Sequence, residues 1–166
     1  QQRFWELARS ASAVDELMKS LEAKVKERPD DAAARMQLAQ SYVAKLLSIP
    51  GGPEQGIWSG KAETQWQEVL SLDPDHWDAR RSLAFNWSMW PDFLNKTPDA
   101  VREYEKLRET QERRVPEAKH GDTYLQLARL YQKQGKPDKA RETLRAGLAR
   151  HPGDAELTKA RDAMED

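Results

Sequence analysis

The sequence predicts an all-α fold, and three observations support that prediction. Stretches rich in Ala, Leu, Glu, Lys, Arg and Gln carry apolar residues three and four positions apart, which is the spacing of one helix face. Prolines and glycines separate these stretches at intervals, and we interpret the prolines as residues that follow helix ends. Continuous β-branched runs and period-two alternation are missing, so no sheet is expected.

The composition is typical of helices that bury only a narrow stripe. Of the 166 residues, 33% are charged and 38% are hydrophobic, so the apolar side chains must be concentrated on one face of each helix. The 27 basic and 28 acidic side chains nearly cancel, which excludes proteins that need a basic surface to bind nucleic acid or anionic lipid. No apolar run approaches the length of a membrane span, so no membrane insertion is expected. The absence of Cys excludes disulfides and metal–thiolate sites.

Each predicted helix is recognised by apolar or small residues on one face. In chain order these are Leu17, Leu21 and Val25; Leu38, Ala39 and Tyr42; Ala62, Trp66 and Val69; Leu83, Ala84 and Trp87; Ala100, Tyr104 and Leu107; Tyr124, Leu127, Ala128 and Tyr131; and Ala140, Leu144 and Gly147. The alanines let paired helices approach closely, and the aromatic residues fill the space between neighbouring pairs. Asp154 stands where the N-cap of a last helix is expected.

The segment between Thr123 and Pro152 carries a specific pattern. A bulky residue, Leu, a small residue and Tyr are followed by a turn at Gly135, and then by Ala, Leu and a second small residue. This order and spacing resemble the tetratricopeptide repeat, a unit of about 34 residues that forms two helices. Two earlier stretches resemble it as well. The resemblance implies a right-handed superhelical stack of about three helix pairs with extra N- and C-terminal helices, in which stacking buries the stripe of each pair.

We expect one domain over residues 1–166, divided into consecutive parts. The parts are an N-terminal partial repeat at 1–30, a first repeat at 31–75, a second at 76–115, a third at 120–153 and a capping helix at 154–166.

The first two repeats depart from the spacing of the third. Eleven extra residues lie between Ala44 and Ala62, and four lie between Met89 and Ala100, in both cases within the turn between paired helices. Insertions in such stacks gather on one face, which is often the binding face. The aromatic residues of these inserts are therefore candidates for a ledge over a binding site, although packing against the flanks of the stack is an alternative. They are Trp58, Trp90 and Phe93.

No constellation of catalytic or metal-binding residues is recognisable. Three histidines lie apart from one another, without a second ligand three or four residues away, and positions at helix ends explain them. They are His76, His120 and His151. Residues 59–61 lack the Ser or Thr that a phosphate-binding loop needs after its Lys. Glu103, Glu105 and Glu109 are interpreted as one solvated helix face, so we expect no enzyme, metal or cofactor.

The resemblance also implies where a partner would bind. In tetratricopeptide proteins the first helix of each repeat lines a concave groove, and the matching positions here combine apolar residues, amides and three cations. They are Met36, Gln40, Val43, Arg81, Phe85, Met89, Leu125, Arg129, Gln132 and Lys133. Such a lining favours an extended peptide or a helix of another protein, whose carboxylates or carbonyls would meet the cations. We therefore predict a non-catalytic adaptor or scaffold.

Three alternatives remain open at this point. The groove could be filled by a helix of the same chain, or the residues around Phe4, Trp5 and Leu7 could dock on a second copy and form a homo-oligomer. A small ligand could also bind beneath the aromatic inserts. The chain resembles short bacterial tetratricopeptide proteins of envelope biogenesis in architecture alone. The absence of an initial Met favours an exported protein, with the cytoplasm as the alternative.

Overall fold

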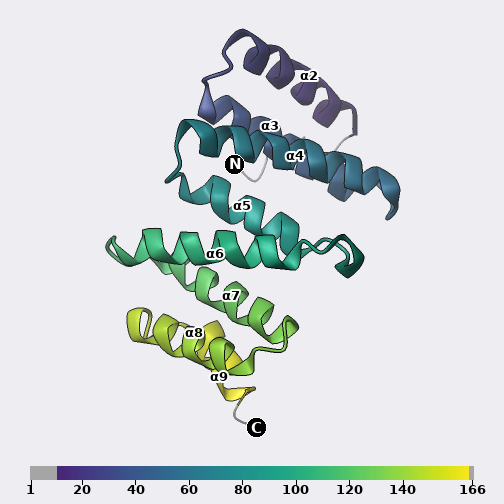
Figure 1. The fold of residues 1–166 in the computed structure, drawn as a ribbon. Coiled ribbons are helices and arrows are strands. Elements are labelled where there is room, and N and C mark those ends of the chain that lie inside the picture. The colour runs from purple at the N-terminus through teal and green to yellow at the C-terminus, as the bar shows by residue number, and fades with distance from the viewer. Residues whose placement is uncertain (1–10, 165–166) are drawn as a thin grey trace. The chain divides into compact units, whose positions relative to one another are not determined.

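The computed structural model of the protein describes residues 11–164 (Figure 1). They form two compact units that divide between Ala79 and Arg80. The described residues contain eight α-helices and two short 3-10 helices, and no strand. The predicted all-α fold is therefore confirmed. None of the described helices is long and apolar enough to cross a bilayer.

The first unit consists mainly of three helices packed in sequence. They are α2 (Ala11–Glu27), α3 (Ala32–Ser48) and α4 (Pro53–Leu72). Helix α3 packs against both α2 and α4, and the predicted stripe residues Leu38, Ala39 and Trp66 are buried between them. Helix α3 begins at Ala32 because the side chain of Asp31 accepts a hydrogen bond from the Ala34 N–H at 2.8 Å. That bond lowers the pKa of Asp31.

The long insert of the first repeat is helical, and the prediction that it enlarges the turn was wrong. Helix α3 continues six residues past Tyr42, whereas its counterpart α7 (Gly121–Lys133) continues two past Tyr131. Helix α4 likewise begins nine residues before Ala62. Pro53 fits this start because the first helical position needs neither a free N–H nor a variable φ. The insert therefore forms a helical hairpin with a short turn, and its tip exposes Leu47 and Ile57.

The second unit contains the last nine residues of α5 (Trp77–Ser88) and four further α-helices. These are α6 (Thr97–Glu112), α7, α8 (Pro137–Arg150) and α9 (Ala155–Asp162), with the 3-10 helices η1 (Asp92–Leu94) and η2 (Ala118–His120) before α6 and α7. Helix α7 packs against α6, α8 and α9. Asp154 caps α9 as predicted, because its side chain accepts hydrogen bonds from the N–H groups of Glu156 and Leu157.

Prolines mark both ends of the helices. Those at positions 29, 74, 116 and 152 follow helix ends, as the sequence predicts. Pro53, Pro98 and Pro137 instead lie in the first turns of α4, α6 and α8. The interpretation that every proline follows a helix end was therefore wrong for these three residues. Proline suits the first turn of a helix as well as the position after its end.

Glu103 is buried, and its assignment to a solvated helix face was wrong. Its side chain forms ion pairs with Arg80, Arg102 and Lys106, and the residue is 6% exposed. Position 103 lies three residues after the buried Ala100 and four before the buried Leu107, so helical spacing places it on the inner face. That spacing is the sequence signal that could have identified it.

Four tyrosines are buried, and three of them donate hydrogen bonds to glutamates of the preceding helix. Tyr42 donates to Glu22 at 2.7 Å, Tyr124 donates to Glu112 at 3.0 Å, and Tyr131 donates to Glu105. Burial and the adjacent carboxylate raise the pKa of Tyr124 and of Tyr131 to about 12. Burial also raises the pKa of Tyr42 and of Tyr104.

Alkaline pH should therefore destabilise the fold. Unfolded tyrosines release their protons near pH 10, whereas the folded chain holds the protons of Tyr124 and Tyr131 up to about pH 12. The unfolded state then binds fewer protons, so the free energy of unfolding should fall as the pH rises from 10 to 12. Urea denaturation across this range checks the expectation. A double variant, Tyr124→Phe with Tyr131→Phe, should show a shallower pH dependence, and an unchanged dependence would contradict the assignment.

Gly147 marks a close approach between α8 and α7. A Cβ at this position would lie 2.8 Å from the Cβ of Tyr124 and 2.9 Å from its Cγ. We expect Gly147→Ala to lower the free energy of unfolding by about 1–3 kcal/mol despite the higher helix propensity of Ala. Gly60→Ala in α4 is the matched control, since its Cβ would meet nothing within 4 Å, and it should stabilise by up to about 1 kcal/mol. Equal effects in thermal unfolding would disprove the packing argument.

Candidate protein-interaction face

The residues predicted to line a groove fall into two groups. Met36, Gln40 and Val43 lie on α3 in the first unit, and the other seven lie on α5 and α7 in the second or directly after α5. Gln40 is exposed, whereas Met36 and Val43 are half-buried. The second group carries most of the charge and has a defined geometry within its own unit.

Two ion pairs join α7 to the segment formed by α5 and η1. Near the start of the helices, the guanidinium of Arg81 donates through Nε and Nη2 to Oδ2 of Asp122, at 3.0 and 2.8 Å. Near their ends, Lys133 Nζ lies 2.5 Å from Oδ1 of Asp92 in η1. The first pair joins α5 to the start of α7 and the second joins η1, beyond the end of α5, to the end of α7, so the two helices run in the same direction. The helix α6 leads the chain back between them (Figure 1).

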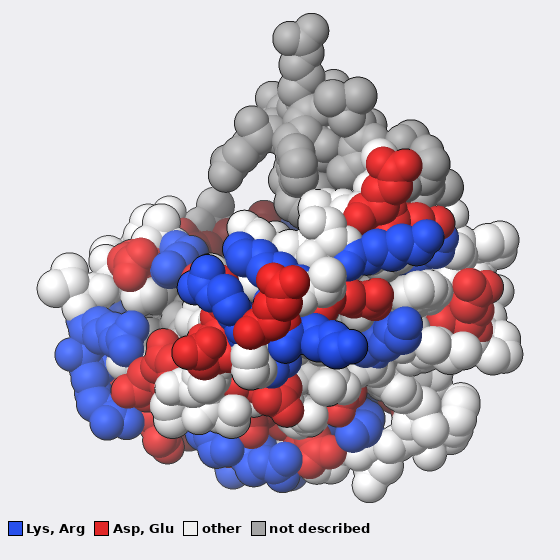
Figure 2. Space-filling model, turned by 90° about the horizontal axis from the view of Figure 1, so that it is seen from above, with Lys and Arg blue, Asp and Glu red and all other residues white. Residues whose placement is uncertain are grey.

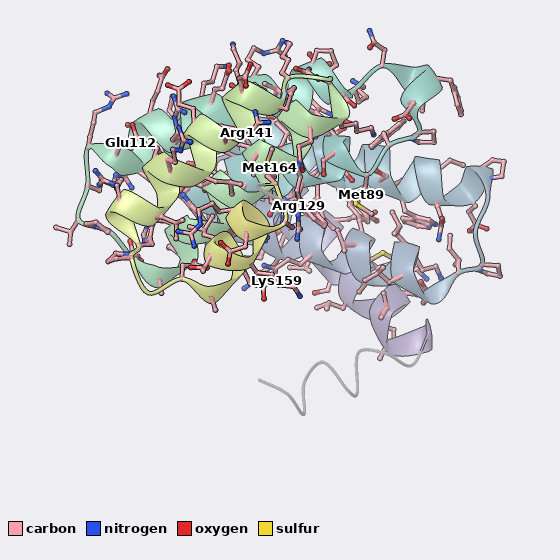
Figure 3. The ribbon with its side chains drawn as sticks, turned by 90° about the horizontal axis from the view of Figure 1, so that it is seen from below. Met89, Glu112, Arg129, Arg141, Lys159 and Met164 are labelled. Carbon is pink, nitrogen blue, oxygen red and sulfur yellow. The ribbon has the colours of Figure 1, made fainter. Side chains whose placement is uncertain are left out.

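The surface between these pairs is called the α5–α7 face. It comprises Arg81, Phe85 and Met89 of α5 and its end, Asp92 and Phe93 of η1, and Asp122, Gln126, Arg129, Gln132 and Lys133 of α7. Met89 and Phe93 are 70% and 84% exposed, and Phe85 is 39% exposed. Met89 and Arg129, both labelled in Figure 3, are exposed side chains of this face. Leu125 is 7% exposed and belongs to the core, so it offers a partner little surface.

The three cations of this face differ in their surroundings. Arg81 is held by Asp122, whose second oxygen accepts a hydrogen bond from Gln126 at 2.9 Å, and Lys133 is held by Asp92. Arg81 also lies 5.7 Å from the centre of the Phe85 ring. Arg129 is exposed and forms no ion pair within residues 11–164. Sequence reasoning identified the cations but missed both acidic partners, because each pair joins positions that are distant along the chain.

The insert aromatics lie in different surroundings. Trp58 lies on α4 in the first unit, half-buried, with its ring centre 5.8 Å from that of Tyr42 and with Lys61 Nζ 4.5 Å above it. Trp90 follows α5 and is half-buried, and Phe93 projects from η1. Trp58 thus packs against Tyr42 and Lys61, whereas the side chain of Phe93 is exposed. Phe4, Trp5 and Leu7 lie outside the described residues.

Two of the three histidines have structural roles at helix starts, as predicted. His76 Nδ1 accepts a hydrogen bond from the Ala79 N–H at 3.2 Å. His120 Nδ1 accepts one from the Glu117 N–H at 3.2 Å, and burial lowers the pKa of His120. Residues 11–164 contain no group of three His, Asp or Glu side chains that could hold a metal ion.

The charges of the surface are mixed. Figure 2 shows Lys and Arg side chains interspersed with Asp and Glu side chains on the described part of the face that it presents. Many of the pairs are local, such as Arg102 with Asp99 and Arg141 with Asp138. A partner would therefore meet single ion pairs at defined positions and no extended surface of one charge sign on this described face.

Comparisons with known proteins identify the repeat and the fold. Residues 121–161 match the family model of the tetratricopeptide repeat. The chain is similar to the solved structure of TTC0263, a thermophilic TPR protein of Thermus thermophilus, with 14% identity and a TM-score of 0.68 over 96% of this chain and 77% of that one. It is also similar to MamA, with 16% identity and a TM-score of 0.68 over 96% of this chain and 81% of that one. The comparison with curated proteins gave no match.

Proposed function

We propose that this chain, a tetratricopeptide repeat protein, is a non-catalytic adaptor that binds a peptide or helical segment of a partner protein along its α5–α7 face. Proteins of this fold generally mediate protein–protein interaction. The observation that carries the proposal is the exposure of Phe85, Met89 and Phe93 on a surface whose two ends are fixed by ion pairs.

The physical argument concerns where the chain exposes its few apolar residues. Only 38% of the residues are hydrophobic, and leaving large ones in water forgoes the free energy that burial would gain. Met89 directly follows α5 and lies one turn after Phe85, to whose carbonyl its N–H donates at 3.3 Å, so the two side chains form one strip. A partner side chain laid on this strip would remove apolar surface of both residues from water. Gln40, Met36 and Val43 of α3 remain predicted contacts.

A paired-variant capture experiment tests the proposal. The double variant Phe85→Ala with Met89→Ala should lose partners that the wild type retains, in affinity capture quantified by mass spectrometry. The matched control, Leu47→Ala with Ile57→Ala, removes two exposed apolar side chains from the α3–α4 tip and should retain them. Because all four side chains are exposed, circular dichroism should show unchanged folding. Identical captured sets for both double variants would refute this location of the binding face.

A further inference from the structure

We propose that the segment bound by the α5–α7 face carries one acidic side chain flanked by apolar ones, and that Arg129 binds its carboxylate. This inference rests on the proposed function and specifies the chemistry of the partner. It follows from which charges of the face are already paired and from where the exposed apolar side chains lie.

Two of the three cations of the face already form ion pairs within the chain. A ligand carboxylate that approached Arg81 would share it with Asp122, and one that approached Lys133 would share it with Asp92. The charge of each cation is already offset by its partner, so a further carboxylate gains less there than at an unpaired cation. Arg129 has no ion pair within residues 11–164, so a carboxylate placed there gains a new charge-assisted contact.

The ion pair between Arg81 and Asp122 relates the apolar residues to this cation. Seven residues after that pair, about two helical turns along each helix, lie Ser88 on α5 and Arg129 on α7, and Met89 directly follows Ser88. Phe85 lies one turn before Met89, and Phe93 lies beyond it in η1. A bound segment would therefore meet apolar side chains on both sides of the position at which its carboxylate reaches Arg129.

The ends of the face offer little to additional acids. Asp122 is paired with Arg81 at one end, and Asp92, which is largely exposed, is paired with Lys133 at the other. A second carboxylate at either end would meet a cation whose charge is already offset, so it would add little to binding. The preferred segment therefore has one central Asp or Glu between apolar neighbours.

This specificity can be tested with a defined probe, a library of short random peptides displayed on phage. The full chain, Arg129→Glu and Arg145→Glu are each used as bait. Arg145 is the matched control, because it is an exposed cation of α8 outside the face and has no ion pair in the part of the chain that the structure describes. Wild type and Arg145→Glu should enrich peptides with an acid between apolar residues, whereas Arg129→Glu should enrich Lys or Arg at that position.

Affinities of the selected peptides complete the test. A selected acidic peptide should bind Arg129→Glu about tenfold more weakly than wild type, with Arg129→Gln in between. An equal acid preference on Arg129→Glu, or selection of peptides without acids by the wild type, would overturn the inference. The proposed function fails separately if Phe85→Ala with Met89→Ala leaves the affinity of these peptides unchanged. A wild-type selection that enriches no peptide would overturn both.

Discussion

Replacing Glu103 with Ala should lower the free energy of unfolding by about 3–5 kcal/mol, the usual cost of breaking a buried ion pair from one side. Glu103 is almost fully buried and pairs with Arg80, itself largely enclosed, as well as with Arg102 and Lys106. Its removal leaves three cations around a space that no longer holds a negative charge. Urea denaturation followed by circular dichroism measures the loss.

The control for this variant lies six residues further along the same helix. Glu109 is exposed, so Glu109→Ala makes the same chemical change in α6 without removing a buried charge, and it should alter stability by less than about 0.5 kcal/mol. Glu103→Gln keeps the shape of the side chain and removes its charge, and should fall between the two. Similar losses for Glu103→Ala and Glu109→Ala would show that the ion pairs of Glu103 contribute nothing specific.

Leu157→Ala should destabilise the second unit by about 2–5 kcal/mol, the range for a fully buried leucine. Leu157 is the one core residue of α9, with no exposed surface, and it reaches the region where Gly147 of α8 and Gly121 of α7 lie. Truncation removes the contact by which α9 covers α7 and leaves a cavity. Thermal unfolding followed by calorimetry should show the lower midpoint.

Lys159→Ala provides the comparison for Leu157→Ala. Lys159 is exposed on the same short helix, so the variant tests whether any change in α9 affects stability. We expect its unfolding temperature to equal that of the wild type within about 2 °C. If Leu157→Ala were equally harmless, α9 would not act as a cap for the second unit.

The positions of the helices could be predicted because each buries a short stripe with a regular period. Leu38 with Ala39, and Leu127 with Ala128, are buried as their spacing requires. The α3–α4 hairpin could not be predicted from residues 50–53, because Pro and Gly there are equally suited to a loop and to the end and start of two helices. The buried residues of α4 lie from Ser59 onward, and their packing stabilises the helix more than the local propensity of residues 50–53 does.

The candidate site could be predicted only in part. The resemblance to the tetratricopeptide repeat identified Phe85, Met89 and Arg129 as groove residues, and all three are exposed. It could not show that Leu125, on the same helix as Arg129, turns into the core, or that Asp92 and Asp122 neutralise two of the cations. These facts depend on side-chain direction and on contacts across 41 residues, and neither leaves a periodic signal in the sequence.

The long connection between α5 and α7 has a consequence for the surface of the second unit. Arg81 and Asp122 form an ion pair although 41 residues, about seven more than the usual repeat of about 34, separate them. The turn that contains η1 and the connection with η2 lie between the two helices. Additional residues in such a turn add exposed side chains, such as Phe93, while the contact between the two helices is kept.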